Sequence, residues 1–334
     1  MRIAVRAPNW IGDSILSIPS MKSLKTNFPG SSLTIVAKNW VKDIFLNLEF
    51  VDDIIVIPDK NDLKSLAAAA KELKKHKFDV GLLLTNSFGS ALLFYMAGIP
   101  ERWGYKKEGR QILLTKSVSN KNHRKQIHQI QYYQNIISGL GLETIPPEMH
   151  LSVTQKEKDL ANEFLLSFDI NPQKKRVILN PGAFYGPSKR WPVSKYRNLA
   201  EILQRKFNPN LIIIGSSAEV ELANSISAHL GKNPINLAGK TTLRMLTGVI
   251  SLTDVVVSND SGPMHLSNAL GIPVVALFGP TIPAATRPFH QPYKVIKKEV
   301  PCWPCSYREC PYDHQCMLKI TPQEVASECE KFIS

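Results

Sequence analysis

The chain alternates between two hydrophobic patterns. Short runs rich in Val, Ile and Leu have the composition of buried strands and are predicted at 2–6, 32–37, 54–57, 80–84, 176–180, 211–214, 255–257 and 274–278. Longer stretches space apolar residues three and four apart, which is typical of helices on a sheet, at 12–27, 62–75, 87–97, 124–140, 193–206, 218–230, 242–251 and 263–270. This alternation predicts parallel sheets with helices on both faces.

The pattern restarts once, after a Gly- and Pro-containing break at residues 141–148. A length of 334 residues fits two domains of ordinary size. We therefore predict an α/β protein with two doubly wound domains facing a cleft, the first covering residues 1–150. Ligands of such sheets bind beyond the carboxyl ends of the strands, so the loops there are the candidate sites.

The loop after the strand at 255–257 has the residues of a helix start. Asn259, Asp260 and Ser261 can cap a helix, Gly262 follows, and Pro263 suits the first turn, where no N–H donor is needed. Free N–H groups and the helix dipole make such an end a site for anions. An ordinary capped turn is the alternative.

A carboxylate follows the first strand. Asp13 lies at the predicted start of the first helix, next to Gly12, and could act as a general base toward a hydroxyl. Stabilisation of the helix start by its charge is the alternative. The segment has no G-x-G-x-x-G, so it does not predict a dinucleotide-type phosphate loop.

Two strand-end loops of the second half carry further candidates. Residues 180–192 combine Gly and Pro with the adjacent cations Lys189 and Arg190, which could bind a diphosphate. Glu219 follows the strand at 211–214 and could bind ribose hydroxyls, or simply cap a helix. A solvated basic loop is the alternative for the first of these.

Composition limits the class. A hydrophobic content of 43% and a charged content of 21% are typical of globular enzymes. We find neither a membrane-spanning run nor a signal peptide pattern, and we expect a cytoplasmic protein.

The net charge of +13 indicates an anionic partner, and eight Lys or Arg residues lie between Arg102 and Lys125 against one acid. A phosphorylated substrate and a membrane surface both fit, whereas no nucleic-acid-binding motif is recognisable. A solvated basic face remains the alternative.

All five cysteines follow residue 301. Cys302, Cys305, Cys310 and Cys316 are clustered, and Cys329 lies apart. A structural metal site (zinc or iron–sulfur), reduced thiols and a conditional disulfide all remain open for the cluster.

Several segments together resemble the lipopolysaccharide heptosyltransferases of glycosyltransferase family 9, most closely the heptosyltransferase II type. The matching segments cover nearly the whole chain: 8–13, 86–88, 97–102, 180–192, 259–265 and 278–281. The resemblance implies a GT-B fold, with an acceptor-binding domain at 1–150 and a nucleotide-sugar domain at 151–320. It also implies a C-terminal helix at 321–334 that returns to the first domain.

The resemblance further implies inverting transfer of heptose from ADP-L-glycero-β-D-manno-heptose to an inner-core heptose of lipopolysaccharide. Asp13 would be the catalytic base and Lys189 a catalytic cation. The implied donor-binding residues are Ser188, Lys189, Glu219 (with Glu221 as its alternative), Asp260, Ser261, Gly262 and His265, although His265 could instead be a core residue. Acceptor contacts are expected from Asn9, Trp10, Asn86, Ser87, Arg102, Lys106 and Arg110.

The chain has no Asp-x-Asp triplet, so we expect cationic loops in place of a catalytic metal, and no cofactor. We also expect a monomer that contacts the cytoplasmic face of the inner membrane and binds no nucleic acid. The alternatives are heptosyltransferase I or III, a related sugar transferase, a noncatalytic nucleotide-sugar-binding protein and a polyanion-binding protein.

Overall fold

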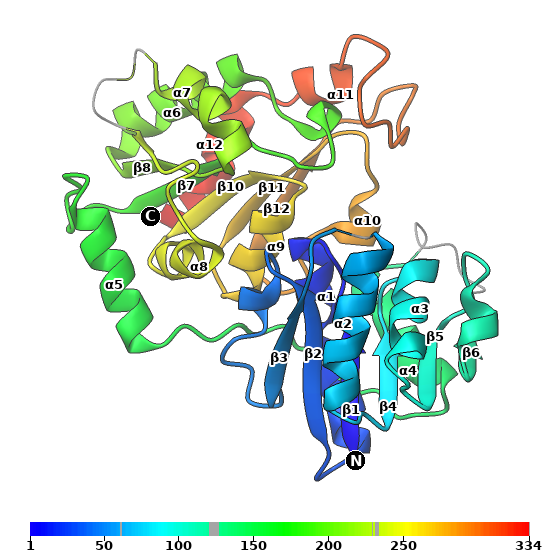
Figure 1. Cartoon of the computed structure of the whole chain (residues 1–334). Helices are drawn as coiled ribbons and strands as arrows, with labels where there is room; N and C mark the ends of the chain where they lie inside the picture. Colours follow the sequence, from blue (N-terminus) through cyan, green and yellow to red (C-terminus); the bar gives the residue numbers. More distant parts are fainter. Residues whose placement is uncertain (61, 120–126, 229, 231–233, 334) are drawn as a thin grey trace. The chain divides into compact units, whose positions relative to one another are not determined.

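The computed structural model describes residues 1–60, 62–119, 127–228, 230 and 234–333. The chain divides into two compact units, Met1–Leu151 (unit 1) and Ser152–Ser334 (unit 2), each built on a six-stranded parallel sheet (Figure 1). In the described part of the chain, no helix is both long and apolar enough to cross a bilayer.

Unit 1 contains a sheet with the strand order β3-β2-β1-β4-β5-β6. Its strands are β1 (Arg2–Arg6), β2 (Ser32–Lys38), β3 (Asp53–Ile57), β4 (Val80–Leu83), β5 (Glu101–Tyr105) and β6 (Lys116–Val118). The helices are α1 (Ile11–Asn27), α2 (Leu63–Lys75), α3 (Phe88–Met96) and α4 (Gln129–Gly139), with the 3-10 turns η1 (Lys42–Ile44) and η2 (Arg110–Leu113).

Unit 2 repeats this topology with the strand order β12-β11-β10-β7-β8-β9. Its strands are β7 (Arg176–Asn180), β8 (Asn210–Ile213), β9 (Ile235–Asn236), β10 (Val255–Asn259), β11 (Val274–Phe278) and β12 (Tyr293–Lys297). The helices are α5 (Gln155–Leu166), α6 (Val193–Phe207), α7 (Val220–Ser227), α8 (Leu243–Ser251), α9 (Gly262–Ala269), α10 (Pro283–Thr286), α11 (Gln315–Leu318) and α12 (Pro322–Ile333), with η3 (Pro187–Lys189) and η4 (Ser217–Glu219).

Helix α1 packs closely on α4 because a row of serines, rather than bulky residues, occupies much of its buried face. Ser14, Ser17, Ser20 and Ser23 have no exposed surface. Each hydroxyl donates to a backbone carbonyl three to six residues earlier, so none is buried without a partner. This arrangement fixes the start of α1, where Asp13 lies.

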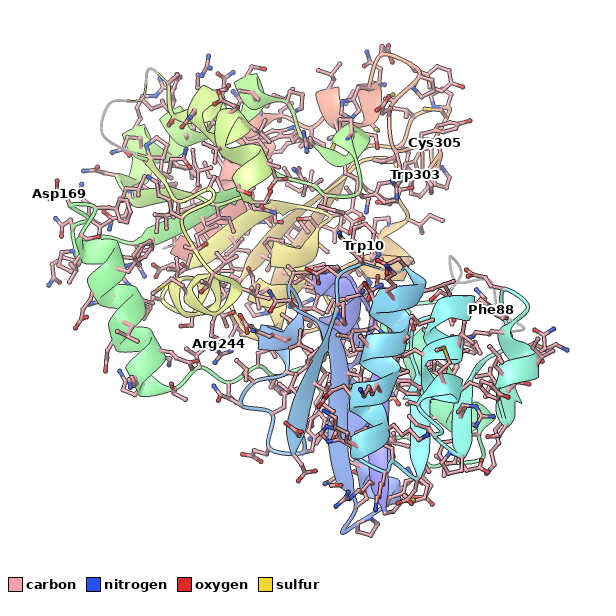
Figure 2. All side chains as sticks on the ribbon, in the orientation of Figure 1. Trp10, Phe88, Asp169, Arg244, Trp303 and Cys305 are labelled. Carbon is pink, nitrogen blue, oxygen red and sulfur yellow. The ribbon has the colours of Figure 1, made fainter. Side chains whose placement is uncertain are left out.

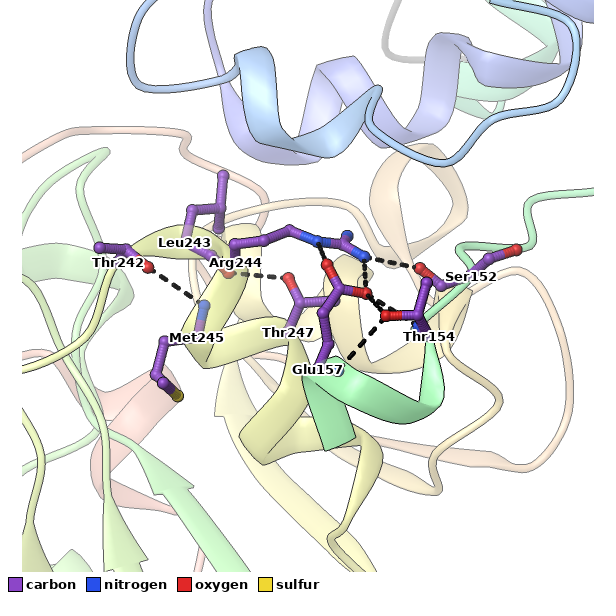
Figure 3. Close-up of polar contacts among 8 residues, drawn as sticks. All are labelled: Ser152, Thr154, Glu157, Thr242, Leu243, Arg244, Met245 and Thr247. Atoms are coloured by element: carbon purple, nitrogen blue, oxygen red, sulfur yellow. Dashed lines mark hydrogen bonds and ion pairs between the residues drawn. The ribbon is translucent and has the colours of Figure 1, made fainter. Parts of the chain in front are cut away.

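Helix α8 is attached to α5 by an ion pair (Figure 3). Arg244 donates from Nε to Glu157 Oε1 at 2.5 Å and from Nη2 to Oε2 at 2.7 Å, and Glu157 also forms a capping box with Thr154. The hydrogen bond from Arg244 is the main reason why the pKa of Glu157 is lowered to about 2. The helices approach closely at Gly248, where an added Cβ would lie 2.8 Å from Ala161 Cβ.

The C-terminal helix, which the resemblance implied would return to the first unit, has its packing contacts in unit 2. Helix α12 belongs to unit 2 and packs on α6, β10 and β11. Its apolar stripe, which includes Val325, Cys329 and Ile333, is buried in the core of that unit. Burial of this stripe against α6 explains the position of the helix.

Candidate functional site

In each sheet, the chain order reverses between two central strands, β1 and β4 in unit 1 and β7 and β10 in unit 2. Ligands of doubly wound sheets bind beyond the carboxyl ends of the strands at this point. Asn9, Asp13 and Asn86 follow β1 and β4, whereas Lys189 and Asp260 follow β7 and β10. Within each unit, the predicted site residues therefore come together at the expected end of the sheet.

In unit 2, Lys189 and Asp260 form a buried ion pair. Lys189 Nζ lies 2.5 Å from Asp260 Oδ2, and the two side chains are only 11% and 5% exposed. Thr281 Oγ1 donates to the same carboxylate oxygen at 2.7 Å. Burial alone would raise the pKa of Asp260, but the charge and hydrogen bond of Lys189, the Thr281 hydrogen bond and His265 outweigh it, so the pKa is lowered. Asp260 is therefore a carboxylate at neutral pH, and it offsets part of the Lys189 charge.

Two buried asparagines, Asn180 and Asn259, join the β7 loop to the β10 turn. Asn180 Nδ2 donates to Ser258 Oγ and to Ser261 Oγ, both at 2.8 Å. Asn259 Nδ2 donates to the Pro181 carbonyl at 2.8 Å, and its Oδ1 accepts from the Trp191 backbone N–H at 3.2 Å. The sequence signal for this role was the position of each asparagine, a polar residue at the end of a buried strand.

The N-terminus of α9 lies beside this network. Ser261 is its N-cap residue, but its side chain makes no capping hydrogen bond to the helix and instead accepts from Asn180. The first N–H groups of a helix have no partner within the helix, and they attract anions together with the dipole. His265, one turn into α9, is 4% exposed and close enough to Asp260 to influence its pKa. The described geometry of this turn is compatible with the predicted phosphate site.

Glu219 caps the turn η4 and also lies against the β7 loop. Its Oε2 accepts from Ser216 N at 2.8 Å and from Ser216 Oγ at 2.9 Å, which is a capping box. Its carboxylate also lies against Gly182 in the β7 loop, where an added Cβ would be 2.2 Å from Oε1, and Arg190 Nη2 is 3.9 Å away. Glu221, its alternative, lies in the first turn of α7 and is exposed.

We call residues 301–316 the Cys-rich segment; Trp303 and Cys305 mark it in Figure 2. It packs on the β7 loop. Ser188 donates from its backbone N–H to the Arg308 carbonyl at 3.1 Å and from Oγ to the Tyr307 carbonyl at 2.5 Å. His314 Nε2 lies 2.7 Å from the Ser188 carbonyl. Since Ser188 is only 3% exposed and bonded in this way, it supports the loop instead of presenting its hydroxyl to a donor.

The five thiols are free, and no disulfide joins them. Burial is the main reason why the pKa of Cys316 is raised to about 11, with smaller contributions from the other three clustered thiols, so this thiol is protonated at neutral pH. Within the described ranges, no three His, Cys, Asp or Glu side chains are arranged to hold a metal ion.

In unit 1, the loop after β1 is held by side-chain contacts. Asn9 Oδ1 accepts from Arg6 Nη2 at 2.6 Å, and the Asn9 carbonyl accepts from Trp40 Nε1 at 2.7 Å. Tyr133 of α4 donates from its hydroxyl to Asp13 Oδ1 at 3.3 Å. Trp10, which Figure 2 labels at this end of the unit, is 43% exposed and presents an aromatic surface.

Arg110, a predicted acceptor contact, has no exposed surface in this structure. Its guanidinium donates to the Thr85 and Tyr105 carbonyls and lies 3.4 Å from Asn86 Oδ1, so it positions the loop after β4. Asn86 also donates to the Tyr132 hydroxyl at 2.8 Å.

The other predicted acceptor residues differ in their surroundings. Ser87 is the N-cap of α3 and accepts from Ser90 N. Arg102 donates from Nε to the Leu113 carbonyl at 2.6 Å and lies over the Tyr95 ring, whereas Lys106 is exposed. Lys121, Arg124 and Lys125, which belong to the predicted basic segment, lie outside the described residues.

Comparison with known proteins gives a consistent result. The family model described as glycosyltransferase family 9 (heptosyltransferase) matches residues 66–315. Lipooligosaccharide heptosyltransferase 2 of Campylobacter jejuni subsp. jejuni serotype O:6 is 31% identical, covering 99% of each chain. Lipopolysaccharide heptosyltransferase 2 of Escherichia coli K12 is 30% identical, covering 98% of this chain and 97% of that protein.

Comparison with solved structures points to the same family. The E. coli ADP-heptose LPS heptosyltransferase II superposes with a TM-score of 0.86 at 28% identity, covering 100% of this chain and 98% of that one. The glycosyltransferase family 9 structure from Veillonella parvula also gives 0.86, at 23% identity, covering 99% and 97%, and supports the fold. The GT-B fold predicted from the sequence is thereby confirmed. The chain belongs to glycosyltransferase family 9, the heptosyltransferases.

Proposed function

We propose that this enzyme transfers L-glycero-D-manno-heptose from ADP-L-glycero-β-D-manno-heptose to the inner-core heptose of lipopolysaccharide, the heptosyltransferase II reaction. The full-length similarity to proteins named heptosyltransferase 2 supports this choice. The observation that carries it is the buried Lys189–Asp260 pair beside the N-terminus of α9, at the switch point of unit 2. This pair supplies a cation for a diphosphate and a carboxylate for sugar hydroxyls.

We assign the donor to unit 2. The diphosphate binds the Lys189 ammonium and the N–H groups at Ser261 and Gly262, because both attract anions. The Asp260 carboxylate accepts from hydroxyls of the heptose, and His265 lies beside it. Glu219 accepts from the ribose hydroxyls. The Asn180 and Asn259 contacts hold these groups in place before the donor binds, which lowers the reorganisation needed during the reaction.

The transfer is a single displacement with inversion. Asp13 removes the proton from the acceptor hydroxyl while that oxygen forms a bond to the anomeric carbon. The bond from this carbon to the diphosphate oxygen breaks, and its electron pair leaves with ADP. Lys189 and the α9 N–H groups stabilise the developing negative charge. Removal of one such preorganised donor typically lowers kcat by about 10²–10³-fold. The mechanism requires no protein nucleophile, cofactor or metal ion.

We assign the acceptor to unit 1, with Asn9, Trp10 and Asn86 at the ends of β1 and β4. The acceptor is part of a lipid, and α3 exposes Phe88, Tyr95 and Met96 to between 40% and 55%. Exposed apolar side chains near the cations of the 102–116 region fit a peripheral contact with an anionic membrane. Cosedimentation with phosphatidylglycerol vesicles, but not with phosphatidylcholine vesicles, would support this contact.

Transfer assays with defined acceptors test the proposed function. Purified enzyme is incubated with ADP-L-glycero-β-D-manno-heptose and with lipid A–Kdo carrying zero, one or two heptoses. We expect transfer only to the acceptor with one heptose. Transfer to the heptose-free acceptor would instead support heptosyltransferase I, and transfer to the acceptor with two heptoses would support heptosyltransferase III. ADP binding without transfer to any acceptor would support the noncatalytic alternative.

A further inference from the structure

The Cys-rich segment holds an arginine next to the loop of Lys189. The backbones touch at Gly186, where an added Cβ would lie 2.4 Å from the Arg308 carbonyl oxygen. Together with the two hydrogen bonds from Ser188 to the carbonyls of Tyr307 and Arg308, this contact fixes the position of residue 308 relative to the loop.

Arg308 and Lys189 share one aromatic ring. The guanidinium carbon of Arg308 lies 5.4 Å from the centroid of the Tyr185 ring, and Lys189 Nζ lies 4.8 Å from it. Tyr185 is itself held, because its hydroxyl donates to the Ser306 carbonyl at 2.7 Å. A guanidinium placed over a ring keeps its N–H edges available for a second partner. Arg308 is also exposed, so that partner can come from solution.

Two cations of the β7 loop, Lys189 and Arg190, lie within ion-pair distance of an acid. Lys189 is paired with Asp260 at 2.5 Å, and Arg190 lies 3.9 Å from Glu219. In the part of the chain that the structure describes, no carboxylate lies within ion-pair distance of Arg308. A diphosphate that arrives here therefore meets one cation whose charge is not already offset by an acid.

We propose that Arg308 binds the diphosphate of the nucleotide-sugar donor as a second cation beside Lys189, and that the Cys-rich segment serves to hold it there. This inference rests on the proposed function. The planar guanidinium can donate two parallel hydrogen bonds to phosphate oxygens, which an ammonium cannot do. Arg308 thereby stabilises bound ADP and the charge that develops on it during transfer.

Arg308→Gln in the full-length chain tests the proposal. Calorimetry at low salt should show about 10-fold weaker ADP binding, the size expected for loss of a charge-assisted hydrogen bond. Binding of adenosine, which lacks phosphate, should not change when followed by ligand-observed NMR. Arg308→Lys should have intermediate affinity for ADP. Arg205→Gln, an exposed arginine of α6, removes the same charge elsewhere in unit 2 and should bind ADP as the wild type does.

The possible results separate the two proposals. Wild-type affinity for ADP in Arg308→Gln, or an equal loss for ADP and adenosine, would overturn the role of Arg308. Gly186→Ala gives an independent test. It displaces the Arg308 backbone, so it should also weaken the binding of ADP more than the binding of adenosine. If the wild-type enzyme binds no ADP and transfers no heptose, the proposed function fails instead.

Discussion

Replacement of Lys189 by methionine should destabilise unit 2, because it leaves the Asp260 carboxylate buried without its counter-charge. The pair is 2.5 Å long, and the side chains are 11% and 5% exposed. Loss of one partner of a buried ion pair costs about 3–5 kcal/mol. Since the hydrogen bond from Thr281 remains, we expect the lower end of this range, about 3 kcal/mol. For a domain of this size, that corresponds to a fall in Tm of roughly 6–12 °C.

The pH dependence identifies the cause. In the wild type, the lowered pKa of Asp260 contributes stability above the pKa of an unpaired Asp, and this stability is lost as the pH falls through the folded-state value. Without Lys189, burial raises that pKa, so the carboxyl is protonated more readily. The loss of stability caused by Lys189→Met should therefore be larger at pH 8 than at pH 5.

Differential scanning calorimetry of wild type, Lys189→Met, Asp260→Asn and the double variant measures both effects. The double variant should regain most of the loss, because it removes the buried charge together with its partner. If Lys189→Met melts within 2 °C of the wild type at both pH values, or if the double variant is no more stable than Lys189→Met, the pair is not the determinant we describe.

Three further predictions concern the scaffold and the chemistry. Gly81→Ala should destabilise unit 1 by about 1–3 kcal/mol, because an added Cβ would lie 2.4 Å from the buried Phe94 ring; an unchanged Tm would contradict this. The pKa of Glu157 is lowered to about 2. Its contribution to the stability of the fold should therefore be complete above the pKa of an unpaired Glu, roughly 4.3, and should be lost as the pH falls through about 2. Acid unfolding of Glu157→Gln should lack this component, whereas Glu163→Gln on the same helix should retain it. Dialysis against EDTA should leave heptose transfer unchanged, because the proposed mechanism uses cationic loops in place of a metal; loss of activity that Mg²⁺ restores would contradict it.

Much of the fold follows from the sequence, because the central strands are continuous β-branched runs. The segments at 2–6 and 176–180 were predicted with the bounds that the structure has. Strands β5, β6, β9 and β12 were missed, and β6 and β9 contain only three and two residues and include Lys116 and Asn236. Such short polar segments are held by pairing with a neighbouring strand, which local pattern does not encode. Helix α5 was missed as well, although Thr154 and Glu157 form a recognisable capping box.

The candidate site could be proposed from the sequence where charged residues follow a strand end. Lys189 was assigned from its loop and Asp260 from its turn together with the family resemblance, whereas their pairing required the structure. The burial of Arg110 could not be foreseen, because a cation within a basic run resembles a solvated residue until its carbonyl partners are known. The role of Ser188 depended in the same way on the distant Cys-rich segment.

The most direct test of the account is the turnover of Asp13→Asn with ADP-heptose and the one-heptose acceptor, measured beside its affinity for ADP. If Asp13 is the base, kcat should fall by about 10²–10⁴-fold, while the Kd for ADP stays within twofold because the proposed donor site lies in unit 2. Turnover close to that of the wild type would contradict the account, since no other carboxylate is proposed to take the proton.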